Sequence, residues 1–209
     1  MFARFILLLS ALLLGACSSN PQQLYLEQVV ASQTPLAETP ADALRNATAI
    51  PIPINPGWRP PQWQITAAEP RIKLDGMIAN YRVFSVDLKK TEPYTIDVNS
   101  WCVNSCLGFS KYALNPRLLL LDAKGNVVAE KLSQASGYVG SISQTIRGTV
   151  IEDGRYYLLV AADNRAPGAT IVMDRLLMVG GASPATPMDI GMGSYPFGHI
   201  GPYLSRPED

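Results

Sequence analysis

Charged residues are scarce in this sequence and make up 16% of its 209 positions, against about 25% in an ordinary soluble domain. Its 17 basic residues balance its 17 acidic residues, so no net field is available to hold nucleic acid. Histidine occurs once, as His199, inside a stretch rich in glycine and proline. A nucleophile needs a base within hydrogen-bond reach, and no sequence pattern around His199 indicates a catalytic base. The sequence also has no G-x-S-x-G turn and no phosphate-binding loop. We therefore expect no catalytic residues, no enzymatic activity and no cofactor.

Long apolar runs are scarce as well, and the one that is present lies at the N-terminus. It extends from Phe5 to Leu14 and follows the basic residue Arg4. About ten residues are too few to cross roughly 30 Å of hydrocarbon, but they fit the apolar part of a cleaved signal peptide. The adjoining residues LGAC, at positions 14–17, resemble the bacterial lipobox, in which the cysteine is acylated and the chain is cut just before it. The resemblance implies a signal peptide over residues 1–16 and a lipid on Cys17; the alternative is an ordinary secretory signal in which this cysteine is incidental.

The residues after the cysteine indicate where the protein resides. Ser18 and Ser19 follow Cys17, and lipoproteins of this kind that lack an aspartate there usually go to the outer membrane. Two or more acyl chains hold a protein stably at a lipid surface. We therefore expect a protein of the outer membrane of a Gram-negative bacterium, attached through its N-terminal lipid and facing the periplasm.

The other two cysteines, Cys102 and Cys106, stand close together in WCVNSC. In an oxidising envelope such a pair first indicates a disulfide. A metal site would need further ligands, and the remaining cysteine and histidine candidates are Cys17 and His199. A redox motif would have a two-residue spacer at the start of a helix. We therefore expect a local disulfide and no metal.

The central part of the chain has the pattern of short β-strands. Residues 81–88 and 94–99 have apolar residues at every second position, as half-buried strands do, while residues 117–121 form a mostly apolar run. Turn sequences at 122–126 and 152–154 separate these from further strands. The pattern predicts an all-β fold, an antiparallel and jelly-roll-like β-sandwich over residues 62–180.

The two flanking segments lack this pattern. Five prolines fall between Pro51 and Pro61, so residues 17–61 are expected to form a lipidated tether and an extended proline-rich linker with short helical turns at most. Residues 181–209 are rich in glycine and proline and are expected to form an irregular tail. The sequence thus places both segments outside the sandwich.

Four segments in order, YRVFSVDL, PYTIDVNS, NPRLLLLDAKGNVVAE and EDGRYYLLVAADN, resemble the bacterial pre-peptidase C-terminal domain, a β-sandwich at the end of secreted peptidases. Together with the upstream segment PADALRNATAIPIP, they also resemble the maltose-operon periplasmic protein family (MalM). These are strand and turn patterns, so the resemblances imply a fold first. The second also implies an accessory role in carbohydrate uptake.

Three carboxylates are candidates for a cation site. Asp122 and Asp153 each have an explanation as turn residues before a glycine. Calcium binding needs six or more oxygen ligands, so a site would require Asp122 to meet Asp153 or Asp163 at one edge of the sandwich. The turn explanation and the calcium alternative both remain open from the sequence alone.

Aromatic residues are the better candidates for contact with a ligand or partner, because their faces stack on sugars and interface hot spots favour Trp and Tyr. The candidates are Trp101, Tyr112 and Trp58, and the alternative is that they only pack in the fold. The sequence thus predicts a non-catalytic outer-membrane lipoprotein whose sandwich binds or braces another envelope component, either an envelope protein or a glycan. The alternative is a MalM-like periplasmic accessory of maltose or carbohydrate uptake that binds an oligosaccharide.

Overall fold

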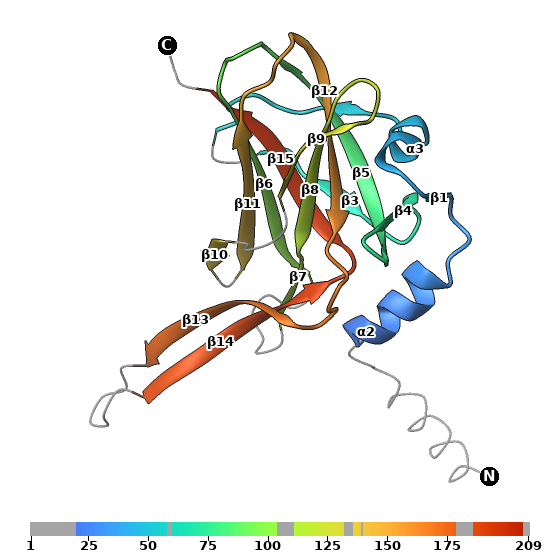
Figure 1. Cartoon of the computed structure of the whole chain (residues 1–209). Coiled ribbons are helices and arrows are strands. Elements are labelled where there is room, and N and C mark those ends of the chain that lie inside the picture. Colours follow the sequence, from blue (N-terminus) through green and yellow to red (C-terminus); the bar gives the residue numbers. More distant parts are fainter. Residues whose placement is uncertain are drawn as a thin grey trace, which may run out of the picture.

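The computed structural model describes residues 20–57, 60–103, 111–131, 136–138, 140–178 and 186–206, which form two packed β-sheets (Figure 1). The expectation of an all-β sandwich is confirmed. Within the described residues the first sheet has seven strands. In spatial order they are β1 (Leu36–Ala37), β4 (Arg71–Leu74), β5 (Met77–Leu88), β12 (Gly154–Ala162), β8 (Pro116–Leu121) and β9 (Val127–Lys131), with β2 (Ile50–Pro51) beside β5.

The second sheet has eight strands within the described residues. Its centre is β6 (Tyr94–Val103), which pairs with β11 (Ser141–Gly148) on one side and with β15 (Gly198–Ser205) on the other. β15 also pairs with β3 (Trp63–Ile65), and β11 pairs with β10 (Ser136–Tyr138). The end of β6 continues through β7 (Lys111–Leu114) to a long hairpin made of β13 (Thr170–Met178) and β14 (Thr186–Tyr195).

β8 shows that the first sheet is buried on both of its sides. Every residue of this strand is buried. Leu118 and Leu120 belong to the main core between the sheets, whereas Leu119 and Leu121 belong to a second core on the outer side of the first sheet. Successive side chains of a strand point to opposite faces, so a strand between two cores requires a continuous apolar run.

The N-terminal segment covers the second core. It contains α2 (Pro21–Leu24), the π-helix η1 (Tyr25–Val30) and α3 (Pro40–Arg45), which Figure 1 places on the side of the first sheet. Ala43 of α3 is fully buried in this core, and its carbonyl accepts a hydrogen bond of 2.9 Å from the hydroxyl of Tyr81 in β5. None of the described helices is long and apolar enough to cross a membrane.

Arg71 of β4 holds the first part of this segment in place. Its side chain is buried and donates to the backbone carbonyls of Val29 at 2.9 Å, Val30 at 3.2 Å and Thr34 at 2.7 and 3.2 Å. A buried guanidinium is stable only where its N–H groups find acceptors, and here the acceptors come from the covering segment. The Arg71 side chain is therefore one of the links between the cover and the sheet.

The sequence predicted a tether and extended linker over residues 17–61, whereas residues 20–57 are packed on the sandwich. Two of the prolines begin helices. Pro21 and Pro40 each follow a residue, Asn20 or Thr39, whose side chain accepts a hydrogen bond from the first turn. Proline is well tolerated at a helix start because that N–H has no partner within the helix. Pro21 and Pro40 thus mark the beginning of short packed helices, whereas Pro51 lies in β2.

The predicted irregular tail over residues 181–209 is wrong for its described part, residues 186–206. β15 pairs with β6 along its length, and Ile200 and Leu204 are buried in the main core. A Cβ added at Gly198 would lie 2.8 Å from the Cβ of Leu114, so glycine is needed there for close packing. The described glycines of this segment, from Gly191 to Gly201, belong to tightly packed strands.

Candidate functional site

The outer side of the second sheet carries a row of residues that crosses four strands. Trp101 of β6 lies opposite Ser141 of β11 and opposite His199 of β15, and His199 lies opposite Gln64 of β3. Directly opposed residues in antiparallel strands share a face, so these four belong to one row. His199 and Gln64 are exposed, and Trp101 is half-buried. We call this surface the open face; it comprises Gln64, Asp97, Asn99, Trp101, Ser141, Ser143, Thr145, His199, Gly201, Tyr203 and Ser205.

Gly201 leaves room for the Trp101 ring on the open face. A Cβ added at Gly201 would lie 2.6 Å from the ring of Trp101 and 3.1 Å from the carbonyl oxygen of Pro61. The indole therefore lies against the backbone of β15, and any side chain at position 201 would displace it. Tyr203 stands two residues further along the same strand. The open face thus has two aromatic residues near Gly201: Trp101, whose ring lies against it, and Tyr203.

Asp97 organises the polar part of the open face. It lies opposite Thr145 and Tyr203 in the neighbouring strands. Its carboxylate accepts hydrogen bonds from the hydroxyl of Thr145 at 2.5 Å and from that of Ser205 at 2.9 Å. Burial raises the pKa of the Tyr203 phenol, the charge of Asp97 adds to the rise, and a hydrogen bond with Asn99 partly offsets it. Tyr203 therefore stays protonated at neutral pH.

These groups can bind a ligand through hydrogen bonds and stacking. Amides, hydroxyls and one hydrogen-bonded carboxylate supply neutral donors and acceptors, while the aromatic faces supply stacking surface. A hydroxyl-rich ligand can use both. The row places Trp101 between His199 and Ser141, so the histidine and this hydroxyl stand on strands that are not neighbours. The arrangement does not form the nucleophile and base pair that covalent catalysis needs.

The structure places some of the residues predicted to matter and leaves others outside its described part. Trp101 lies at the centre of the open face, as just described. Cys102 is disulfide-bonded, while its predicted partner Cys106 lies outside the described residues, so the pairing stays a prediction. Cys17 and Trp58 also lie outside the described residues, and their roles stay predictions.

Sequence reasoning missed His199 and Tyr203 as members of a site because both fall in the predicted tail. Alternation along β15 was the available signal: Ile200 and Leu204 are buried, while His199 is exposed and Tyr203 half-buried. Short strands interrupted by glycine hide this period, because few positions remain to show it.

Tyr112 lies at the root of a projecting hairpin. Figure 1 shows β13 and β14 extending away from the sandwich, and we call this hairpin the arm. The ring of Tyr112 packs 5.7 Å from the ring of Tyr195 in β14, and Tyr195 packs 6.5 Å from Phe197. A Cβ added at Gly193 would lie 2.9 Å from the ring of Tyr112. These contacts show Tyr112 packing at the root of the arm.

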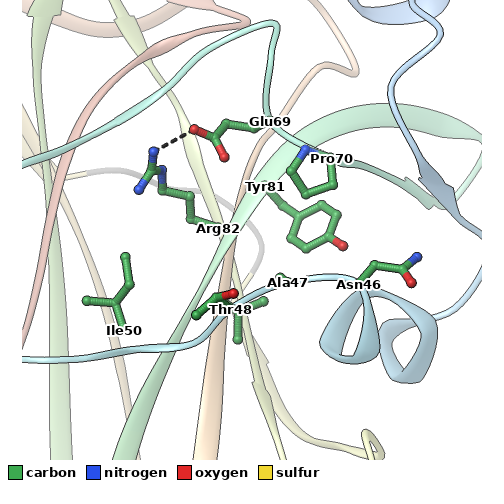
Figure 2. Close-up of a pocket in the computed structure, with 9 residues that line it drawn as sticks. Asn46, Ala47, Thr48, Ile50, Glu69, Pro70, Tyr81 and Arg82 are labelled. Atoms are coloured by element: carbon green, nitrogen blue, oxygen red, sulfur yellow. Dashed lines mark hydrogen bonds and ion pairs between the residues drawn. The ribbon is translucent and has the colours of Figure 1, made fainter.

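A cleft of about 350 Å³ lies at the edge of the first sheet, where β5 passes from its partner β4 to its partner β2. Figure 2 shows Arg82 and Glu69 on one side of it, joined by an ion pair of 2.5 Å, with Tyr81 beside them. Burial raises the pKa of Tyr81 to about 12, and its hydroxyl is bonded to the Ala43 carbonyl. The titratable groups of the cleft are thus already engaged within the fold.

The three carboxylates considered for calcium are engaged in separate places. Asp122 accepts the backbone N–H of Asn126 at 2.9 Å and its side-chain amide at 2.8 Å, and that side-chain bond is the main reason its pKa is lowered. Asp153 accepts a backbone N–H at 2.5 Å, and Asp163 pairs with Arg165 at 2.6 Å. No group of three potential metal ligands is found within the described part of the chain.

Comparison with solved structures gives a distant likeness. Neither a protein family nor a curated protein matches this sequence. Among solved structures, the chain is similar to the pre-peptidase C-terminal domain of a collagenase from Bacillus anthracis, with 11% sequence identity and a TM-score of 0.32, over 76% of this chain and 95% of that one. The likeness concerns the same domain type as one of the two resemblances in the sequence, and it carries no argument about function.

Proposed function

We propose that this protein is a non-catalytic lipoprotein of a Gram-negative outer membrane, anchored through an acylated Cys17 and facing the periplasm, whose sandwich binds another envelope component. The proposed binding surface is the open face. One observation carries the proposal: the chain covers the outer side of its first sheet with its own N-terminal segment but leaves Trp101 and Tyr203 on the outer side of the second. Trp and Tyr are the residues that most often anchor interfaces.

The polar groups of the open face support binding without prior rearrangement. Asp97 is already fixed by Thr145 and Ser205, and the Trp101 ring already lies against Gly201. A surface whose side chains are held in place loses less conformational entropy when it binds. Because these side chains are already fixed, the open face favours a role in binding a component over a role in its chemical conversion.

The test is affinity capture of the detergent-extracted, acylated protein from its own envelope, with mass spectrometry of the bait and of what it retains. We expect an acyl mass on Cys17 and a stoichiometric component that is lost in Trp101→Ala. Tyr157→Ala, a half-buried aromatic on the first sheet, is the matched control and should retain the component. An unmodified Cys17, or retention unchanged by Trp101→Ala, would contradict the proposal.

A second candidate function is that of an accessory in carbohydrate uptake that binds an oligosaccharide. Two aromatic residues around Gly201, next to neutral amides and hydroxyls, favour a sugar over a protein partner at this surface. Titration calorimetry with maltooligosaccharides and envelope glycans tests it. Trp101→Ala should weaken binding by about 10-fold, the loss of one stacking contact, whereas Tyr157→Ala should not. A protein component captured without any measurable glycan affinity would reject this second candidate.

A further inference from the structure

The cleft at the edge of the first sheet lies where β5 passes between two partner strands (Figure 2). Among the described strands, the pairing with β4 ends at Asn80 and the pairing with β2 begins at Phe84. The N–H of Tyr81 donates to the carbonyl of Pro70 at 3.1 Å. Backbone groups of a strand point to alternate sides, so the N–H of Val83 faces the same edge. The cleft, which Val83 lines, therefore offers a backbone donor between the two partner strands.

An ion pair forms one side of this cleft. The Nη2 atom of Arg82 donates to Oε1 of Glu69 at 2.5 Å, and the two side chains are 27% and 22% exposed. The Nε atom of Arg82 is buried and has no hydrogen-bond partner within the described part of the chain. A guanidinium has five N–H donors, and a carboxylate has two acceptor oxygens. The pair therefore keeps the capacity to donate from Arg82 and to accept at Glu69 after its own bond is made.

The fold positions both charges before any ligand enters. The backbone carbonyl of Glu69 accepts a hydrogen bond of 2.6 Å from the side-chain amide of Asn80, a fully buried residue of β5. The N–H of Glu69 donates to the carbonyl of Thr66 at 3.2 Å. Arg82 lies within the long strand β5, opposite Val160 of β12. Groups that are held in place lose less conformational entropy on binding, so the pair is a preformed contact for a ligand.

The size and charge of the cleft limit the ligands that fit it. Its other walls combine an amide and a hydroxyl with apolar surface and include Asn46, Ala47, Thr48, Ile50 and Pro70. A volume of about 350 Å³ is at the lower end of the range for small-molecule sites. A ligand with only negative charge would be repelled by Glu69, and one with only positive charge would be repelled by Arg82. A small molecule that carries both charges can face each of them with the opposite sign.

We propose that this cleft binds a small zwitterion of the amino-acid or dipeptide class. The ligand carboxylate accepts hydrogen bonds from the guanidinium of Arg82 and the N–H of Val83, and the ligand ammonium donates to the carboxylate of Glu69. Hydrogen bonds between charged groups are stronger than those between neutral groups. The cleft belongs to the first sheet and the open face to the second, so the inference goes beyond the proposed function and does not depend on it.

Titration calorimetry of the purified protein with matched probes tests the two charged contacts. The probes are L-alanine, L-alanyl-L-alanine, the N-acetyl derivative of this dipeptide and its C-terminal amide. We expect the dipeptide to bind and each derivative to bind about 10-fold more weakly, because each derivative lacks one of the two charges. The absence of binding by both alanine and the dipeptide at millimolar concentration would overturn the proposal. Equal affinity for the dipeptide and its two derivatives would overturn it as well.

Substitutions assign each ligand charge to its protein partner. Glu69→Gln keeps an acceptor oxygen for Arg82 but removes the charge, so it should bind the dipeptide and its N-acetyl derivative with equal, reduced affinity. Arg82→Met should bind the dipeptide and its amide with equal, reduced affinity. Arg155→Met is the matched control, because this arginine lies on the same sheet, is 60% exposed and does not line the cleft. Wild-type affinity for the dipeptide in Arg82→Met or Glu69→Gln would contradict the proposal.

A third variant tests the cleft itself while the ion pair stays intact, and it keeps the test valid if Arg82→Met does not fold. Thr48 lines the cleft and is exposed, so Thr48→Trp should narrow the cleft without unfolding the protein. We expect dipeptide affinity to fall by about 10-fold while denaturant unfolding stays unchanged. Unchanged affinity would place the ligand elsewhere and reject the proposal. Trp101→Ala should leave dipeptide binding unchanged, so failure at the cleft and failure at the open face are separate results.

Discussion

The two sheets of this sandwich treat their outer sides in opposite ways. On the first sheet a group of outward residues is apolar, among them Tyr81, Leu119 and Leu159, and the N-terminal segment covers this group. On the second sheet the corresponding positions are Asp97, Asn99 and Trp101, and they form the open face. Both sheets share the main core between them. The difference shows that burial in the main core does not determine which residues lie on the outer side of either sheet.

The largest expected effect comes from breaking the cover. Arg71→Met removes the donors to three carbonyls of the covering segment and leaves those carbonyls unpaired beside a buried strand. We expect a loss of about 3 kcal/mol in the free energy of unfolding, because hydrogen bonds to a charged group are among the stronger ones. Denaturant unfolding measures it. Lys73→Met, whose native side chain is 53% exposed two residues away, should change stability by less than about 0.5 kcal/mol.

The next effect concerns a charge near the end of the covered sheet. Burial alone raises the pKa of Asp163, but the hydrogen bonds and charge of Arg165 outweigh it, so the pKa lies below its ordinary value. The stabilisation is therefore complete above the unfolded pKa of about 3.9 and is lost as pH falls through the lower folded value. Asp163→Asn should cost about 2 kcal/mol at pH 7 and progressively less below about pH 4.

Thermal unfolding across pH checks this expectation. Asp87→Asn is the control, because the Asp87 and Arg155 side chains are 73% and 60% exposed and an exposed pair contributes little. A loss of stability in Asp163→Asn that is the same at pH 3 and pH 7 would show that the carboxylate charge is not the cause.

The open face can be altered with little effect on the fold. Gly201→Ala forces the Trp101 ring away from β15, since the added Cβ would lie 2.6 Å from it. We expect affinity for the retained envelope component to fall by about 10-fold while stability changes by about 1 kcal/mol. Parallel capture and denaturation measurements separate the two. A drop in stability without a change in affinity would mean that the contact of Trp101 with Gly201 serves packing alone.

The smallest effect lies on the inner side of the second sheet. Both polar atoms of the Gln144 side chain are buried and have no hydrogen-bond partner within the described residues. Gln144→Leu removes an uncompensated amide and keeps its approximate volume, so we expect stability to rise by up to about 1 kcal/mol. Denaturant unfolding checks this. A loss of 1 kcal/mol or more would show that the amide has a partner.

The sequence was sufficient to predict the sandwich, because long alternating strands such as β5 and the apolar run of β8 carry their period over many residues. It was not sufficient for the two flanking segments. α3 has six residues, and β1 and β2 have two each, so their burial depends on distant partners such as Tyr81. Trp101 was predicted to be a contact residue from its place beside Cys102, and that role stays a prediction. Its neighbours His199 and Tyr203 join it only through the pairing of β15 with β6, which no local pattern reveals.

The position of β8 between two cores has a consequence for how the protein unfolds. Its odd and even residues serve two different cores, so neither core can lose its packing without exposing one side of the same strand. Layers that share a strand in this way unfold as one cooperative unit, and the cover cannot peel away as an independent piece at low cost. Heating or denaturant should therefore give a single transition when it is followed by the fluorescence of tryptophan and by hydrogen exchange of the N-terminal segment.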